Sequence, residues 1–103
     1  MIDALRSVLL VEDNGDDEEL TLRGLKQAML QNPVDVARDG QEAVDYLFGT
    51  DEQPPMPVPA VVVLDLHLPR IGGLDVLRQI RAQERTRRLP VVILTSSSED
   101  RRL

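Results

Sequence analysis

Four short runs of aliphatic residues, separated by segments with helical periodicity, constrain the fold of this chain most strongly. They cover residues 8–11, 34–37, 60–64 and 91–94, and only the second run is interrupted by a charged residue. Uninterrupted runs of Val, Ile and Leu are typical of strands that are buried on both faces of a sheet. The sequence therefore predicts four strands, and the composition of three of them is typical of strands with an apolar face on each side of a sheet.

The segments between these runs have the periodicity of amphipathic helices. The first segment begins with four acidic residues, which the helix dipole favours in a first turn, and continues with apolar residues at helical spacing: Leu20, Leu22, Leu25, Met29 and Leu30. We expect a second helix over residues 41–48, started by the turn at Asp39 and Gly40. A third helix is expected over residues 73–83, with an apolar face made of Leu74, Leu77 and Ile80.

A strict alternation of strand and helix predicts an α/β protein with a doubly wound parallel sheet, which has helices on both sides. Residues 49–59 hold four prolines, so we expect a loop there, because proline disrupts both helices and strands. A chain of 103 residues is long enough for one domain only.

Composition excludes several classes of protein. The chain has no cysteine and a single histidine, His67, which excludes disulfide frameworks, thiolate metal sites and two-histidine sites. No apolar run approaches the ~20 residues that cross a bilayer, and the first residues do not form a secretion signal. We therefore expect a cytoplasmic protein with no membrane contact.

Charge is distributed unevenly along the chain. Residues 1–52 hold 13 acidic and 4 basic residues, whereas residues 53–103 hold 5 acidic and 8 basic residues. Five arginines between positions 78 and 88 could indicate nucleic-acid binding, but a solvated helix face and the turn after it explain them as well. The acidic first half and the scarcity of aromatic side chains argue against nucleic acid as a partner.

Polar residues follow three of the predicted strands at the point where each strand ends. Glu12 and Asp13 follow the first strand, Asp65 the third, and Thr95 and Ser96 the fourth. Ligands of open parallel sheets bind beyond the carboxyl ends of the strands, so we expect these residues to meet at one edge. Two carboxylates ~4 Å apart repel each other by about 4 kcal/mol at an intermediate dielectric constant. A cation with oxygen ligands relieves this repulsion, and Mg²⁺ is the expected cofactor.

Each of these groups also has a simpler explanation. An acidic pair before a helix often only caps it, and an Asp at a strand end commonly forms an Asx turn. Thr-Ser-Ser before Glu99 is typical of a helix N-cap. Because all three groups fall at carboxyl ends within one alternating pattern, we favour a phosphoryl-transfer site in which Asp65 forms an aspartyl phosphate.

Four blocks of the sequence resemble the receiver domain of two-component response regulators. They are VLLVEDN at residues 8–14, VVLDLHLP at 62–69, GG at 72–73 and VILT at 92–95, and the resemblance covers essentially the whole chain. The end of the second helix at Phe48 and Gly49 and the proline-rich loop after it are similar to the single-domain subgroup that includes phytochrome-associated response regulators. The resemblance implies a flavodoxin-like receiver fold with strand order 2-1-3-4(-5).

The resemblance also implies a role for each matching residue. Asp65 matches the phosphoacceptor, which receives a phosphoryl group from a sensor histidine kinase; the subgroup implies a bacteriophytochrome. Asp13, Asp65 and the backbone carbonyl of His67 match the Mg²⁺ ligands, and Glu12 acts through a metal-bound water. Thr95 matches the switch hydroxyl, and the hydroxyl of Ser96 is a further candidate for binding the phosphoryl group.

One feature departs from the family pattern. Receivers have a further strand ending in Lys-Pro and a last helix, whereas the only lysine here is Lys26, on the first predicted helix. The chain therefore offers no phosphoryl-binding lysine. We expect residues 1–103 to be a receiver domain that lacks its last strand and helix, which leaves residues 91–94 as an exposed sheet edge.

The predicted function is a phosphorylation-activated switch, not an enzyme beyond self-catalysed phosphorylation and dephosphorylation of Asp65. Its output would be a contact with another protein, a phosphate sink for the kinase, or a homodimer. One alternative is an interaction module of the same fold that does not switch. Another is a phosphatase with an aspartyl nucleophile, although His67 stands where such enzymes place a second acid.

Overall fold

The computed structural model describes residues 6–27, 31–66, 68 and 71–94 of the chain. Four strands and three helices alternate within these residues: β1 Val8–Val11, α1 Gly15–Gln27, β2 Val34–Ala37, α2 Gly40–Phe48, β3 Val61–Asp65, α3 Gly73–Ala82 and β4 Val91–Leu94. The predicted alternation is confirmed, although β3 lies one residue later than expected and α3 ends one residue earlier. Met29 and Leu30, expected on the first helix, lie outside the described residues.

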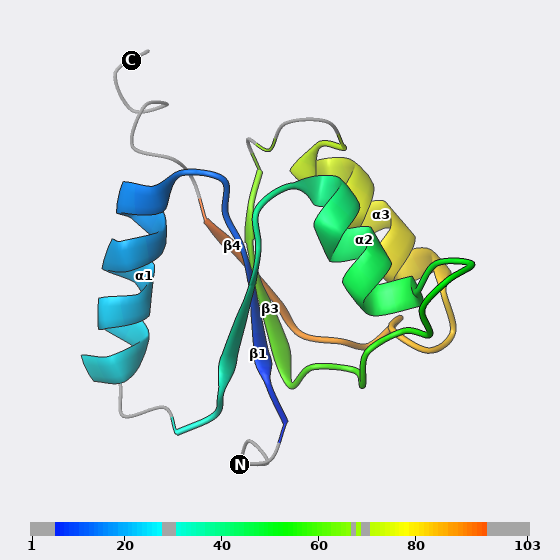
Figure 1. The fold of residues 1–103 in the computed structure, drawn as a ribbon, viewed down its shortest axis with the longest axis horizontal. Coiled ribbons are helices and arrows are strands. Elements are labelled where there is room, and N and C mark those ends of the chain that lie inside the picture. The colour runs from blue at the N-terminus through cyan, green and yellow to red at the C-terminus, as the bar shows by residue number, and fades with distance from the viewer. Residues whose placement is uncertain (1–5, 28–30, 67, 69–70, 95–103) are drawn as a thin grey trace.

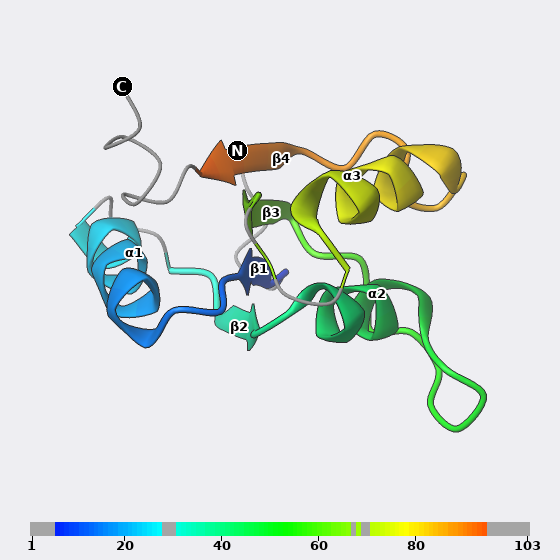
Figure 2. The same cartoon turned by 90° about the horizontal axis from the view of Figure 1, so that it is seen from above.

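The four strands form one parallel sheet in the order β2-β1-β3-β4. Helix α1 covers one face of this sheet, and α2 and α3 lie side by side on the other (Figures 1 and 2). This arrangement confirms the doubly wound, flavodoxin-like order expected from the sequence. A fifth strand is not among the described elements, so that part of the expected order stays a prediction.

The hydrophobic core lies on both faces of the sheet because strand side chains alternate in direction. Leu9 and Val11 of β1 belong to the cluster under α2 and α3, whose helices contribute Leu47 and Ile80 among others. Val8 and Leu10 belong to a smaller cluster with Val63, against which Leu22 and Leu25 of α1 pack. All four residues of β1 are consequently buried, as an uninterrupted apolar run predicts.

Two leucines expected on the apolar faces of helices are instead exposed, which corrects the prediction. Leu20 of α1 is 64% exposed and Leu74 of α3 is 54% exposed. The core-facing residues are Leu22 and Leu25 in α1 and Val76 and Ile80 in α3. Each exposed leucine stands two residues before a core-facing one, a rotation of about 200° around a helix, so it points away from the sheet.

Helix α2 begins where the Asp39-Gly40 turn predicts. The side chain of Asp39 accepts a hydrogen bond from the backbone N–H of Glu42 at 2.8 Å and caps the helix. The helix ends at Phe48, and its C-cap is Gly49, whose φ of 79° is a conformation that glycine adopts without strain. The proline-rich segment that follows contains neither helix nor strand, as expected.

Strand β4 lies at an edge of the described sheet, as the sequence predicts. Its central residues Val92 and Ile93 are 50% and 40% exposed, whereas β1 in the middle of the sheet is fully buried. A groove of about 560 Å³ runs between α1 and β4 and has an almost entirely apolar lining that includes Leu25, Val63 and Val92. None of the helices in the described part of the chain is both long and apolar enough to span a membrane.

Candidate functional site

Parallel pairing of β1 with β3 places two carboxylates side by side at the carboxyl edge of the sheet. Val11 pairs with Leu64, and the residues that follow them are Glu12 and Asp65. The backbone N–H of Glu12 donates to Ala37 at 2.9 Å, so Glu12 continues the line of β1. Together with Asp13, these residues form a cluster in which carboxylate oxygens of all three lie within 4.8 Å of one another.

Glu12 and Asp65 are nearly inaccessible to solvent, with 3% and 2% of their surfaces exposed, whereas Asp13 is exposed. Burial raises the pKa of Glu12 to about 7, and its side-chain hydrogen bond with Asp65 adds to this increase. The backbone N–H of Asn14, which donates to the carboxylate of Glu12 at 3.3 Å, acts in the opposite direction. Burial thus makes the charged form of Glu12 unfavourable, and the nearby charge of Asp65 adds to this cost, which a cation would relieve.

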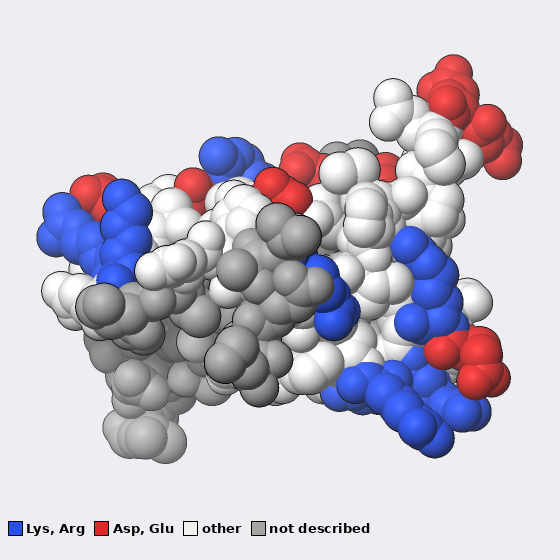
Figure 3. Space-filling model, turned by 90° about the horizontal axis from the view of Figure 1, so that it is seen from below, with Lys and Arg blue, Asp and Glu red and all other residues white. Residues whose placement is uncertain are grey.

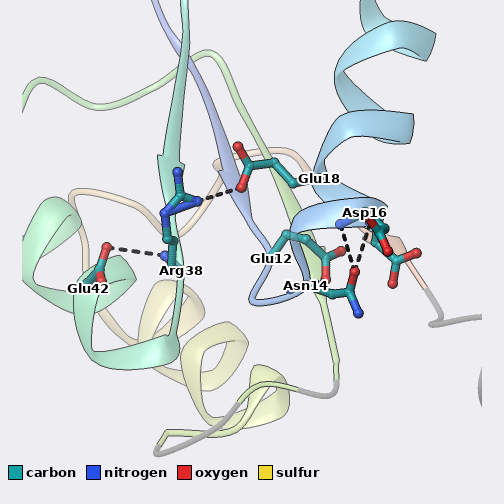
Figure 4. A network of polar contacts seen from close by, with 7 residues as sticks. Glu12, Asn14, Asp16, Glu18, Arg38 and Glu42 are labelled. Carbon is teal, nitrogen blue, oxygen red and sulfur yellow. Dashed lines mark hydrogen bonds and ion pairs between the residues drawn. The ribbon is translucent and has the colours of Figure 1, made fainter.

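Asn14 caps α1, which removes the simpler explanation for the acidic pair before it. Its side-chain oxygen accepts hydrogen bonds from the backbone N–H groups of Asp16 at 2.8 Å and Asp17 at 3.0 Å (Figure 4). Helix α1 therefore has its N-cap without using the carboxylates of Glu12 and Asp13. The same cap fixes the turn between β1 and α1 and so holds these two carboxylates in place.

An ion pair close to this edge is not evident from the sequence. Arg38 directly follows β2, and its guanidinium donates to Glu18 in the first turn of α1, while its backbone N–H donates to Glu42 of α2 (Figure 4). Arg38 thereby joins one helix from each face of the sheet. The sequence places Arg38 at the carboxyl end of a strand and so near the site. It does not indicate the partner of Arg38, because Glu18 lies 20 residues earlier.

Helix α3 approaches the backbone of Asp65 so closely that only glycine fits at its first position. A Cβ atom on Gly73 would lie 2.5 Å from the carbonyl oxygen of Asp65 and 2.6 Å from the Cα atom of Leu66. The backbone N–H of Gly73 donates to the carbonyl of Leu66 at 3.3 Å. The second glycine of the Gly72-Gly73 pair thus allows α3 to support the strand end that carries Asp65.

Three predicted site residues, His67, Thr95 and Ser96, lie outside the described residues. Thr95 follows Leu94 in the sequence, and Leu94 is the residue of β4 that pairs with Asp65. The structure therefore brings together Glu12, Asp13 and Asp65, and the roles of the other three residues stay predictions.

The carboxylate cluster lies where the order of the sheet changes direction. From β1 the chain crosses to β2 on one side, and β3 and β4 follow on the other side. This topological switch point is the usual ligand site of doubly wound sheets. Fold and site together define a small α/β domain with a carboxylate cluster that can hold a cation.

Comparison with known proteins identifies the family within this class. Residues 8–103 match the family described as the response regulator receiver domain, and the chain belongs to that family. It is 41% identical over 93 residues to the probable methanogenesis regulatory protein FilR2 of Methanothrix harundinacea, covering 90% of this chain and 59% of that protein. Response regulator Rcp1 of Synechocystis is 36% identical over 93 residues, covering 90% of this chain and 63% of that protein. The chain thus spans about three fifths of the length of these relatives.

Solved structures show the same fold. The bacteriophytochrome response regulator AtBRR is 50% identical with a TM-score of 0.83, covering 97% of this chain and 73% of that one. The phosphorylated cyanobacterial phytochrome response regulator RcpA is 37% identical with a TM-score of 0.80, covering 94% of this chain and 70% of that one. The receiver domain of the sensor histidine kinase PA1611 from Pseudomonas aeruginosa PAO1 is 30% identical with a TM-score of 0.73, covering 96% of this chain and 75% of that one. That structure has a magnesium ion coordinated in its active-site cleft.

Proposed function

We propose that this chain accepts a phosphoryl group on Asp65 from a sensor histidine kinase and acts as a signalling switch. The observation that carries the proposal is the cluster of Glu12, Asp13 and Asp65 at the carboxyl edge of a receiver-family sheet. The similarity to a phosphorylated phytochrome response regulator supports it.

In the proposed step, a carboxylate oxygen of Asp65 attacks the phosphorus of a phosphohistidine on the kinase. An oxygen–phosphorus bond forms and the nitrogen–phosphorus bond breaks, and the leaving imidazole takes up a proton. The product is an acyl phosphate on Asp65 and a free histidine on the kinase. The step needs an ionised Asp65, which the backbone packing of Gly73 holds at a fixed position.

The three clustered carboxylates fit a hard divalent cation, because they offer oxygen ligands within a small space. Asp13 and Asp65 are the proposed direct Mg²⁺ ligands together with the carbonyl of His67, and Glu12 is proposed to act through a metal-bound water. A bound Mg²⁺ supplies charge neutralisation for the phosphoryl oxygens. A relative with magnesium in its active-site cleft supports this assignment.

Thr95 and Ser96 are proposed to donate hydroxyl hydrogen bonds to the phosphoryl oxygens and to couple phosphorylation to a change of the protein surface.

The similarity to AtBRR and RcpA supports a bacteriophytochrome as the kinase. Self-catalysed transfer on Asp65, a homodimer as the output and a cytoplasmic location stay predictions.

The test is phosphorylation by a small phosphodonor such as acetyl phosphate, followed by intact mass spectrometry with and without Mg²⁺. The expected result is one added phosphoryl group that depends on Mg²⁺ and is lost in Asp65→Asn. Asp75→Asn is the matched control, because Asp75 is an exposed carboxylate on α3 that pairs with Arg78. Equal labelling of Asp65→Asn and the wild-type chain would contradict the proposal.

The two alternative functions make different predictions. A non-switching interaction module would bind the phosphoryl mimic beryllofluoride with Mg²⁺ but show no change in hydrogen exchange away from the site. A phosphatase would turn over a phosphomonoester many times per chain. The proposed switch predicts a hydrogen-exchange response and no such turnover.

A further inference from the structure

A second cavity lies at the amino ends of the strands, opposite the carboxylate edge. Its volume is about 590 Å³, and it lies among residues that precede β1, β3 and β4. Four arginines line it: Arg6, Arg85, Arg87 and Arg88. Figure 3 views the molecule from the amino ends of the strands and shows Lys and Arg side chains on both sides of this face, with the largest group at the lower right.

Among the residues that the structure describes, most of this positive charge has no carboxylate partner. The contacts of Arg6 there are with backbone carbonyls in the loop before β3, and those of Arg85 are with carbonyls at the end of α2 and in the loop after it. Carbonyl groups are neutral, so both guanidinium groups keep their full charge. Within the described part of the chain, Arg87 pairs with Glu84 at 3.2 Å and Arg88 has no ion pair. Glu84 is the one acidic residue among the described residues that line the cavity, so the four arginines leave an excess of positive charge.

The loop that presents Arg87 and Arg88 is held against α3 by side-chain hydrogen bonds to backbone carbonyls. Thr86, only 1% exposed, donates its hydroxyl to the carbonyl of Ile80 at 2.7 Å. Arg81 donates to the carbonyls of Arg87 at 3.0 Å and Leu89 at 2.6 Å. A loop fixed in this way loses little conformational entropy when its exposed side chains bind a ligand.

We propose that this cavity binds a short acidic segment of a partner protein. The arginines match carboxylate side chains in charge and geometry, and the walls formed by Val58 and Leu89 offer contact to an apolar residue between them. The carbonyl contacts of Arg6 and Arg85 fix the positions of these two guanidinium groups, so their charges face a ligand without further ordering of the side chains.

A short peptide fits these observations better than a nucleic acid. The two aromatic residues of the chain, Tyr46 and Phe48, do not line the cavity, so no ring is available for base stacking. The whole chain has a net charge of −6. Screening limits electrostatic attraction to about 8 Å at physiological ionic strength. A short acidic segment therefore meets the local arginines, whereas a long polyanion would also meet the acidic remainder of the surface.

The cavity and the carboxylate cluster lie at opposite ends of the strands, because the cavity is lined by residues that precede β1, β3 and β4, whereas the carboxylates stand at the carboxyl ends of β1 and β3. A partner bound at the amino ends therefore leaves the edge that carries Asp65 accessible. The chain could therefore contact a kinase at one end of the sheet and an acidic segment at the other end at the same time.

The test uses a fluorescein-labelled peptide that alternates acidic residues with leucine, and measures fluorescence anisotropy at low and high salt. We expect saturable binding to the 103-residue chain that weakens with salt. The double variant Arg87→Glu/Arg88→Glu should bind at least about tenfold more weakly. The matched control Arg23→Glu/Arg78→Glu makes the same charge change at two exposed arginines outside the cavity and should bind like the wild type. Circular dichroism checks that both variants are folded.

Three outcomes would overturn the proposal: no saturable binding of the peptide, an equal loss of binding in the control variant, or tighter binding of a single-stranded DNA of equal charge. The last result would assign the cavity to nucleic acid. Amide chemical shift changes in the folded wild-type chain should centre on residues 84–90, and changes centred on residues 12–14 would also contradict the proposal.

Discussion

The carboxylates of Glu12 and Asp65 lie within 4.8 Å of each other, although they stand at the ends of different strands. Both are almost completely buried, so either a proton on Glu12 or a bound cation would relieve the unfavourable negative charge of Glu12. The parallel register of β1 and β3 creates this relationship, because Val11 and Leu64 pair immediately before the two acids.

Without divalent cations, the thermal stability of the chain should fall as the pH rises from about 5 to about 8. The pKa of Glu12 is raised from 4.5 to about 7 in the folded state, so between these values the folded chain binds more protons than the unfolded chain. The contribution of protonated Glu12 is fully present below pH 4.5 and is lost as the pH rises through 7. Scanning calorimetry across this range measures it. Glu12→Gln should flatten this part of the profile, and a wild-type profile that matches the variant would contradict the assignment.

Asp13→Asn should weaken Mg²⁺ binding by at least about tenfold with little effect on folding, because Asp13 is an exposed proposed ligand. Isothermal titration calorimetry at neutral pH measures the affinity. Glu19→Gln is the matched control, since it removes one negative charge from an exposed position on α1 that pairs with Arg23. A similar loss of affinity in both variants would assign the effect to overall charge instead of a ligand.

The sequence was sufficient to predict the elements and the convergence of the three carboxylates, because both follow from local pattern and one general rule. Uninterrupted aliphatic runs identify buried strands, and parallel strands place their carboxyl ends at one edge. Glu12, Asp13 and Asp65 could thus be placed together without any knowledge of side-chain contacts.

Other features depend on geometry that the sequence does not show directly. The exposure of Leu20 and Leu74 follows from the rotation of each helix against the sheet, which hydrophobic spacing alone leaves open. The arginine-lined cavity joins Arg6 to Arg88, residues that are far apart in the chain and meet only through the order of the strands. The ion pair of Arg38 with Glu18 depends on the same long-range packing.

Gly73→Ala should destabilise the chain by about 1–3 kcal/mol, because the new methyl group would overlap the backbone of Asp65 and Leu66. Chemical denaturation measures the loss. Gly24→Ala is the matched control: it lies within α1 with no atom within 4 Å of the new Cβ, so it should be neutral or stabilise the helix by up to about 1 kcal/mol. Phosphorylation of a folded Gly73→Ala chain should also be slower, because α3 supports the strand end that carries Asp65. Equal stability of the two variants would contradict this close approach.

The 103-residue chain should self-associate through β4, since this edge strand presents Val92 and Ile93 to solvent next to the apolar groove against α1. Exposed apolar edge strands pair with other chains, and a single charged side chain on the edge opposes such pairing. Val92→Lys should therefore shift the chain toward monomer in sedimentation velocity measurements over a range of concentrations. Leu74→Lys places the same charge on an equally exposed leucine of α3, away from the edge, and should leave the association unchanged. A wild-type chain that stays monomeric at every concentration, or a Leu74→Lys variant that dissociates as readily as Val92→Lys, would show that β4 is not the associating surface.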